Sequence, residues 1–239
     1  MSNSGYKLQR HVTLLEKEIK DAQKPLILTE GKYDAKILEI VWQKLNEGQE
    51  CPYIFRPVDP TDVADGGSGG AEMLLKAIEA VHPADMRKAI AIFDRDTEGI
   101  KAFNKLSKNF KTLSDQDSVK VHINKLAFAI LLPVPSGREN YADNESLSIE
   151  FMFTDDILHK RTGDNRGLKL KKHLPVIVYK NKTFKLNQQQ LSLLNFQDIC
   201  YGIVDGKKTF VNEIVPSLDE TCFNSFRPLC DLLERIIND

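Results

Sequence analysis

The sequence predicts an α/β protein with a central parallel sheet flanked by helices, followed by a smaller α+β C-terminal extension. Short apolar runs, typical of buried strands, alternate four times with helical segments, and the connections between them are short. Two acidic clusters directly follow two of these runs. Because the carboxyl ends of parallel strands meet at one edge of a sheet, where ligands bind, these clusters predict a site there.

The elements follow from the spacing of apolar residues. Helical spacing predicts an amphipathic helix over residues 7–22, which ends before Pro25. Then come a strand at 26–29, a helix at 35–45, a weaker strand at 53–58, a glycine-rich loop at 65–70, a helix at 71–81, a strand at 88–93, a helix at 99–106 and a strand at 126–132. The turn-rich segment beyond residue 140 ends the alternation. It precedes a basic stretch at 160–172, a hairpin of strands at 176–179 and 183–186, and a mostly helical remainder.

These patterns divide the chain into three parts: an N-terminal helix (1–23), a sheet domain (24–155) and an α+β extension (156–239). The net charge is only −1 over 239 residues, so polyanion binding requires a local patch. The longest apolar stretch, at 126–135, contains prolines and is too short to span a bilayer, and no hydrophobic signal segment begins the sequence. The four cysteines lack paired spacing, which indicates reduced thiols in a cytoplasmic protein.

The two acidic clusters carry the strongest chemical signal. Glu30 and Asp34 lie four residues apart across a strand-to-helix turn, and Asp94 and Asp96 lie two apart, on one side of extended backbone. Carboxylates in contact repel by roughly 4 kcal/mol per pair at an effective dielectric near 20, and a divalent cation relieves this. Such oxygen donors suit Mg²⁺ or Mn²⁺, either as two ions or as one ion with Glu30 carrying a proton. Alternatively, Asp34 serves only the first turn of its helix, where an acid meets the positive dipole end.

Residues 29–34 (TEGKYD) and 94–99 (DRDTEG) resemble the two signature motifs of the TOPRIM domain, which topoisomerases, bacterial primases, ribosomal-RNA maturases and OLD-type nucleases share. The resemblance covers residues 24–135. It is closest to the OLD-type nucleases and to anti-phage TOPRIM effectors such as that of the PARIS system. Those proteins also carry a Ser-x-Glu motif, matched here by Ser148 and Glu150, and a downstream lysine, matched by Lys207 or Lys208. Residues 24–155 would then be a TOPRIM catalytic domain.

The resemblance implies a nuclease that cleaves phosphodiester bonds of transfer RNA, other RNA or DNA. Glu30, Asp94, Asp96 and one of the two lysines would be catalytic. The implied metal ligands are Glu30, Asp34, Asp94, Asp96, Ser148 and Glu150. A toxic effector of anti-phage defence is the expected biology. OLD-type nucleases fuse an ATPase to this domain, but the chain contains no GxxxxGK[ST] loop, so we expect any regulatory ATPase to be a separate chain. A homodimer is compatible with the resemblance, but the sequence itself gives no signal for the oligomeric state.

Several alternatives remain open. The basic stretch is either a solvated face or a phosphate-binding patch, whose residues would be Lys160, Arg161, Arg166, Lys169, Lys171 and Lys172. Arg95 is expected to point away from its neighbouring aspartates, toward phosphate or solvent. Ser148 is either a ligand or the N-cap of a helix. For the whole chain, a housekeeping RNA-processing nuclease and a catalytically silent binding module are the alternatives to a defence effector.

Overall fold

A computed structural model describes residues 23–59, 70–81, 87–113, 116–172, 176–179, 182–185 and 200–238. The predicted helix at 7–22 and residues 65–69 of the glycine-rich loop lie outside the described residues. In the described part of the chain, no helix combines the length and apolar character that a bilayer crossing requires.

The sheet contains six strands in the order β2 (Ile54–Asp59), β1 (Leu26–Gly31), β3 (Ala89–Phe93), β7 (Ala127–Leu131), β6 (Gln116–His122) and β5 (Phe110–Leu113). The four strands β2, β1, β3 and β7 are parallel, which confirms the predicted α/β class. Strands β6 and β5 extend the sheet in antiparallel fashion and were not predicted.

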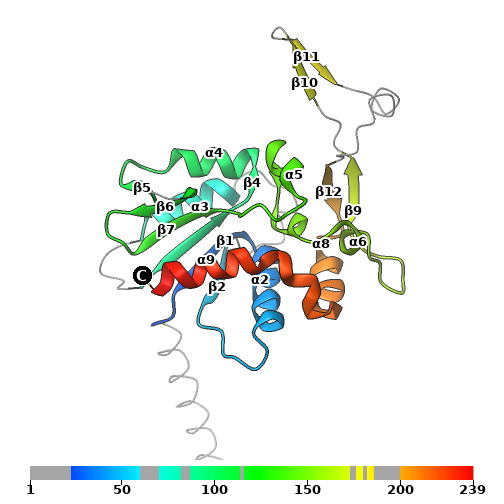
Figure 1. Ribbon diagram of the computed structural model, residues 1–239, viewed down its shortest axis with the longest axis horizontal. Coiled ribbons are helices and arrows are strands. Elements are labelled where there is room, and N and C mark those ends of the chain that lie inside the picture. The colour runs from blue at the N-terminus through cyan, green and yellow to red at the C-terminus, as the bar shows by residue number, and fades with distance from the viewer. Residues whose placement is uncertain are drawn as a thin grey trace, which may run out of the picture.

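Helices cover both faces of the sheet (Figure 1). Helices α2 (Lys32–Leu45) and α9 (Arg227–Asn238) lie on one face, and α3 (Gly70–Glu79) and α4 (Thr97–Lys105) lie on the other. Strand β3 shows the consequence, because Ile90 and Ile92 join the core on the α2 face while Ala91 and Phe93 join the core on the α3 face. Burial of both faces explains why these strands read as uninterrupted apolar runs.

Smaller elements follow β7. They are α5 (Glu139–Asp143), β8 (Ser146–Leu147), the 3₁₀ turn η3 (Ile149–Met152) and α6 (Asp155–Leu158), and β8 pairs in antiparallel fashion with β4 (Arg95–Asp96), which directly follows β3. The helical C-terminal segment comprises α8 (Lys207–Thr209), η4 (Phe210–Ile214), η5 (Val215–Ser217), η6 (Glu220–Phe226) and α9. Its apolar side chains join those of α2 in one core.

Two antiparallel ribbons belong to the C-terminal part. The hairpin of β10 (Val176–Tyr179) and β11 (Lys182–Lys185) was predicted, and its second strand begins one residue earlier than expected. The ribbon of β9 (Lys169–Lys172) and β12 (Tyr201–Asp205) was not predicted. The basic stretch is therefore a loop only as far as residue 168, and it ends in a strand.

The order of the parallel strands locates the candidate site. From β1 the chain passes to β2 on one side and afterwards to β3 on the other side, so the direction of winding reverses between β1 and β3. In open α/β sheets, ligands bind outside the carboxyl ends of the strands at such a switch point. Glu30 is the penultimate residue of β1, and Asp94 directly follows β3 at this point.

Candidate active site

The turn after β3 holds two of the predicted aspartates against the sheet. Asp96 is the N-cap of α4, and its carboxylate accepts a hydrogen bond from the Gly99 N–H at 2.7 Å. Helix α4 begins so close to the strand that a Cβ on Gly99 would lie 2.2 Å from the Asp94 carbonyl oxygen. The glycine of the DxDxxG motif is therefore required sterically, because any side chain there would push Asp94 and Asp96 out of place.

Asp34 has two roles. Its carboxylate accepts a hydrogen bond from the Gly31 N–H at 2.8 Å, which satisfies a free donor at the start of α2. The predicted position of Asp34 in the first turn of α2 is thus confirmed. Burial raises the pKa of the same side chain, and the charges of Glu150 and Asp96 add to this effect, which indicates that Asp34 also lies near other acids of the site.

Glu150 and Lys207 form the second half of the site. The Glu150 side chain has 0% of its surface exposed, and its Oε1 lies 2.9 Å from Lys207 Nζ. The Ser148 hydroxyl donates to Glu150 Oε2 at 2.7 Å. Ser148 is the N-cap residue of η3, as one alternative predicted, but its side chain makes no capping hydrogen bond and donates to Glu150 instead. Lys207, not the exposed Lys208, lies at the carboxylates.

Three acids of the site, Glu30, Asp94 and Asp34, have pKa values above those of isolated carboxyls. Burial, followed by the charges of Asp96 and Asp34, raises the pKa of Glu30 from its ordinary 4.5 to about 8. Burial and the charge of Glu30 raise the pKa of Asp94 well above its usual range. Burial and Glu150 raise the pKa of Asp34 to about 6, against the opposing effect of Lys207. Mutual raising of this kind is the signature of like charges sharing one site.

In the Glu150–Lys207 pair, by contrast, each group stabilises the charged form of the other. Burial alone would raise the pKa of Glu150, but the charge of Lys207 and the hydrogen bonds from Lys207 and Ser148 outweigh it and lower that pKa. Glu150 in turn raises the pKa of Lys207, against burial, and Asp34 and Asp94 add to this effect. Lys207 therefore remains a cation at the edge of the acidic cluster at neutral pH.

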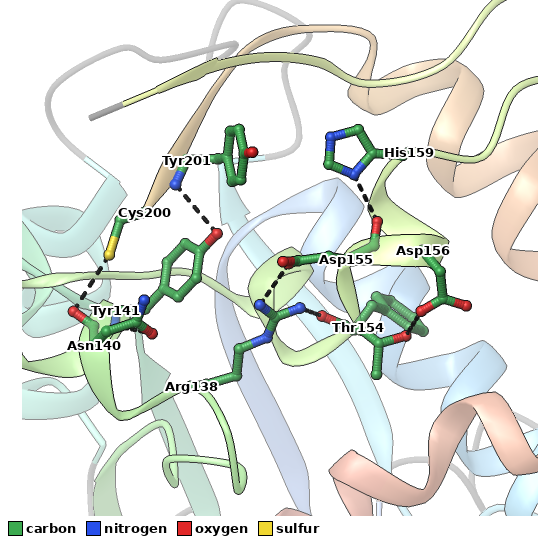
Figure 2. Close-up of polar contacts among 10 residues, drawn as sticks. Arg138, Asn140, Tyr141, Thr154, Asp155, Asp156, His159, Cys200 and Tyr201 are labelled. Atoms are coloured by element: carbon green, nitrogen blue, oxygen red, sulfur yellow. Dashed lines mark hydrogen bonds and ion pairs between the residues drawn. The ribbon is translucent and has the colours of Figure 1, made fainter. Parts of the chain in front are cut away.

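A polar scaffold that the sequence did not reveal supports this pair (Figure 2). The buried Arg138 donates to the Phe153 carbonyl and to Asp155 at 2.6 Å, which fixes the segment that follows η3. The ring of Tyr141 stacks on Phe151 within η3, with centroids 4.7 Å apart. The Tyr141 hydroxyl accepts a hydrogen bond from the Tyr201 N–H at 3.1 Å. The scaffold thus ties η3, which carries Glu150, to β12, which leads to Lys207.

The predicted phosphate-contacting residues lie in different environments. The Arg95 Nε donates to the carbonyl of Leu132, the residue after β7, and burial lowers the pKa of Arg95, so its contact with phosphate or solvent stays a prediction. Arg166 pairs with Asp164 at 3.3 Å and with Glu213 at 3.2 Å, and Lys169 pairs with Asp205 at 2.7 Å. Four others are exposed and form no ion pair with a carboxylate of the described residues: Lys160, Arg161, Lys171 and Lys172.

The donor set fits a hard divalent cation. Glu30 Oε1 is buried and has no hydrogen-bond partner among the described residues. The hydrogen bonds that hold Asp34 and Asp96 each use one of two carboxylate oxygens. In the described part of the chain, no three or more His, Cys, Asp or Glu side chains form a group arranged to hold a metal ion. Binding would therefore require side-chain rotations that draw the carboxylate oxygens together.

Comparison of the chain with protein-family models, with curated proteins and with solved structures finds no match.

Proposed function

We propose that this protein is a metal-dependent nuclease of the TOPRIM type, which hydrolyses phosphodiester bonds of RNA or DNA using Mg²⁺ or Mn²⁺. The observation that carries the proposal is the gathering of five carboxylates around a sheet switch point with one lysine at their edge. These residues are Glu30, Asp34, Asp94, Asp96, Glu150 and Lys207. Titratable groups with strongly perturbed pKa values at such a place mark functional sites.

Glu30, Asp94 and Asp96 are the residues we assign to metal binding, with Asp34 and Glu150 completing the set. A bound Mg²⁺ or Mn²⁺ would neutralise these carboxylates and polarise a phosphodiester oxygen. Since ligands must be deprotonated, binding would release the proton that Glu30, with a pKa of about 8, holds at neutral pH.

Lys207 supplies the positive charge that the chemistry needs. Its ammonium is fixed by Glu150 and stays protonated, so it can donate to the negative charge that develops on phosphate oxygens in the transition state. If Asp94 and Asp96 hold the ion without Glu30, Glu30 is instead suited to move a proton to or from the reacting water or leaving group, because its pKa in the absence of metal lies near neutrality. Ser148 orients Glu150 through its hydroxyl.

Incubation of the purified chain with transfer RNA and with duplex DNA tests the activity. We expect cleavage in Mn²⁺ or Mg²⁺, none in EDTA, and a loss of at least a hundredfold in the Glu30→Gln variant. Glu47→Gln is the matched control, because Glu47 is an exposed acid on the loop after α2. Intact nucleic acids after incubation of the folded wild type with Mn²⁺ would refute the proposal.

The biological role that we propose, a toxic effector of anti-phage defence restrained by a separate ATPase, follows from the motif resemblance. Expression of the wild type alone should slow growth, whereas Glu30→Gln should grow like an empty vector and Glu47→Gln like the wild type. Equal growth of wild type and Glu30→Gln would exclude a toxin. Cleavage of one structured precursor at a fixed position, without toxicity, would instead favour an RNA-processing enzyme.

A further inference from the structure

One surface of the molecule has a charge unlike the rest of the chain. Residues 160–172 contain six Lys or Arg side chains and a single acid, Asp164, although the whole chain carries a net charge of −1. We call this segment, together with Lys208, the basic arm. Only Arg166 and Lys169 of the arm form ion pairs among the described residues, and both are exposed pairs, which contribute little to stability. The arm therefore offers its positive charge to an external anion.

The arm adjoins the proposed active site. Strand β9 pairs with β12, and Lys169 lies opposite Asp205, two residues before Lys207. A Cβ on Gly206, whose φ is +92°, would lie 2.1 Å from the Gly167 carbonyl oxygen. The arm and the turn that presents Lys207 are therefore in direct backbone contact. In Figure 1, β9, β12, α6 and α8 lie together at this end of the molecule.

The lysines on β9 extend away from the site in a regular row. Leu170 points toward the core, which leaves Lys169 and Lys171 on the opposite face of the strand. At about 3.3 Å per residue they are about 7 Å apart along the strand, close to the rise of two nucleotides in a duplex. Lys169 is the inner end of the row, opposite Asp205, and Lys171 is further out; Lys172, on the face of Leu170, ends the strand.

The segment 160–172 contains no aromatic residue. Proteins that bind single strands stack successive bases on aromatic side chains. Outside the β10–β11 hairpin, the exposed large hydrophobic side chains of the described residues are Met73, Ile123 and Val204, none of which is aromatic. The aromatic residue of the ribbon, Tyr201, is half-buried and packs edge-on against His159. Exposed cations without a stacking platform match a ligand that presents phosphates outside and keeps its bases inside.

We propose that the basic arm binds the phosphate backbone of duplex nucleic acid and guides it to the carboxylate cluster beside Lys207. This inference rests on the proposed nuclease function and adds the substrate class, a duplex or the helical part of a structured RNA. Recognition by lysines on phosphates carries no base specificity, so binding should be strongly salt-dependent and insensitive to sequence.

Equilibrium binding tests the inference separately from cleavage. The full chain carrying Glu30→Gln is titrated, in EDTA, against fluorescein-labelled DNA and RNA duplexes and against single strands of the same length. Adding Lys171→Gln and Lys172→Gln should lower the slope of log affinity against log salt by about 2. That change is worth about tenfold in affinity between about 50 and 200 mM salt. The matched control adds Lys108→Gln and Lys111→Gln, two exposed lysines at the opposite edge of the sheet region.

We expect the duplexes to bind more tightly than the single strands, the arm variant to lose affinity and the control variant to retain it. Equal salt slopes for the two variants would overturn the inference, as would preferential binding of single strands. If the wild type cleaves nucleic acid while the arm variant binds normally, the inference fails and the nuclease stands. If duplex binding depends on the arm but nothing is cleaved in Mn²⁺, the nuclease fails and the inference stands.

Discussion

Replacement of Lys207 by methionine should destabilise the fold far more than the same change at its neighbour Lys208. Methionine keeps the aliphatic volume but leaves the fully buried Glu150 without its cation. Breaking one partner of a buried pair costs about 3–5 kcal/mol. The Lys207 side chain is 28% exposed, so water screens the pair in part, and we expect the lower end, about 3 kcal/mol. For a chain of this size that corresponds to a fall in Tm of roughly 6–12 °C.

Urea and thermal unfolding at pH 7 measure this difference. Lys208→Met should change the free energy of unfolding by less than about 0.5 kcal/mol, because Lys208 is exposed. Adding Glu150→Gln to Lys207→Met should recover most of the loss, since no buried charge is then left alone. The loss should also shrink as the pH falls, because a Glu150 without its lysine takes up a proton. Equal stability of the two lysine variants, or no recovery in the double variant, would show that the pair does not stabilise the fold.

Three further predictions concern the site and its supports. In EDTA, unfolding free energy should fall as pH rises from about 4.5 to about 8, because folded Glu30 retains a proton that the unfolded chain has lost. Glu30→Gln should reduce that slope, the rest of which comes from the raised pKa values of Asp34 and Asp94, and an unchanged slope in urea titrations would contradict the raised pKa of Glu30. Gly206→Ala should lower the free energy of unfolding by about 1–2 kcal/mol or more, because Gly206 has a φ of +92° and approaches the Gly167 carbonyl closely. Gly163→Ala should leave the free energy of unfolding unchanged, because there is open space around Gly163. Equal effects of the two substitutions would contradict the close approach. Arg138→Met should lower the free energy of unfolding by about 1.5–3 kcal/mol, because Asp155 and the Phe153 carbonyl lose their hydrogen-bond donor. The same substitution should slow Mn²⁺-dependent cleavage without weakening duplex binding. An unchanged cleavage rate would contradict a positioning role for Arg138.

The sequence was sufficient for the parallel part of the sheet and for the acids at its edge. Strands buried on both faces leave uninterrupted apolar runs such as that of β3, and short connections limit the topology. Acids at or just after the ends of such strands must fall at the carboxyl edge, so the sequence alone predicts that Glu30 and Asp94 lie together. Gly99 was part of the motif, but its steric reason became visible only in the structure.

The elements that the sequence did not predict depend on contacts between distant segments. Lys169–Lys172 has little strand propensity, and it becomes β9 because β12 pairs with it. The choice between Lys207 and Lys208 depends on which side chain the Gly206 turn directs toward Glu150, and adjacent lysines look alike in sequence. Arg138 and Tyr141 act on segments well apart from them in the chain, such as Tyr201, so no local pattern marks them.

Titration of the protein with Mn²⁺, followed by the electron paramagnetic resonance signal of the free ion, examines the carboxylate cluster most directly. The wild type and Glu47→Gln should each remove at least one Mn²⁺ per chain from solution at neutral pH, and Asp94→Asn should remove none. Free Mn²⁺ that is undiminished by folded wild-type protein, or binding that survives Asp94→Asn unchanged, would contradict a metal centre built on Glu30, Asp94 and Asp96.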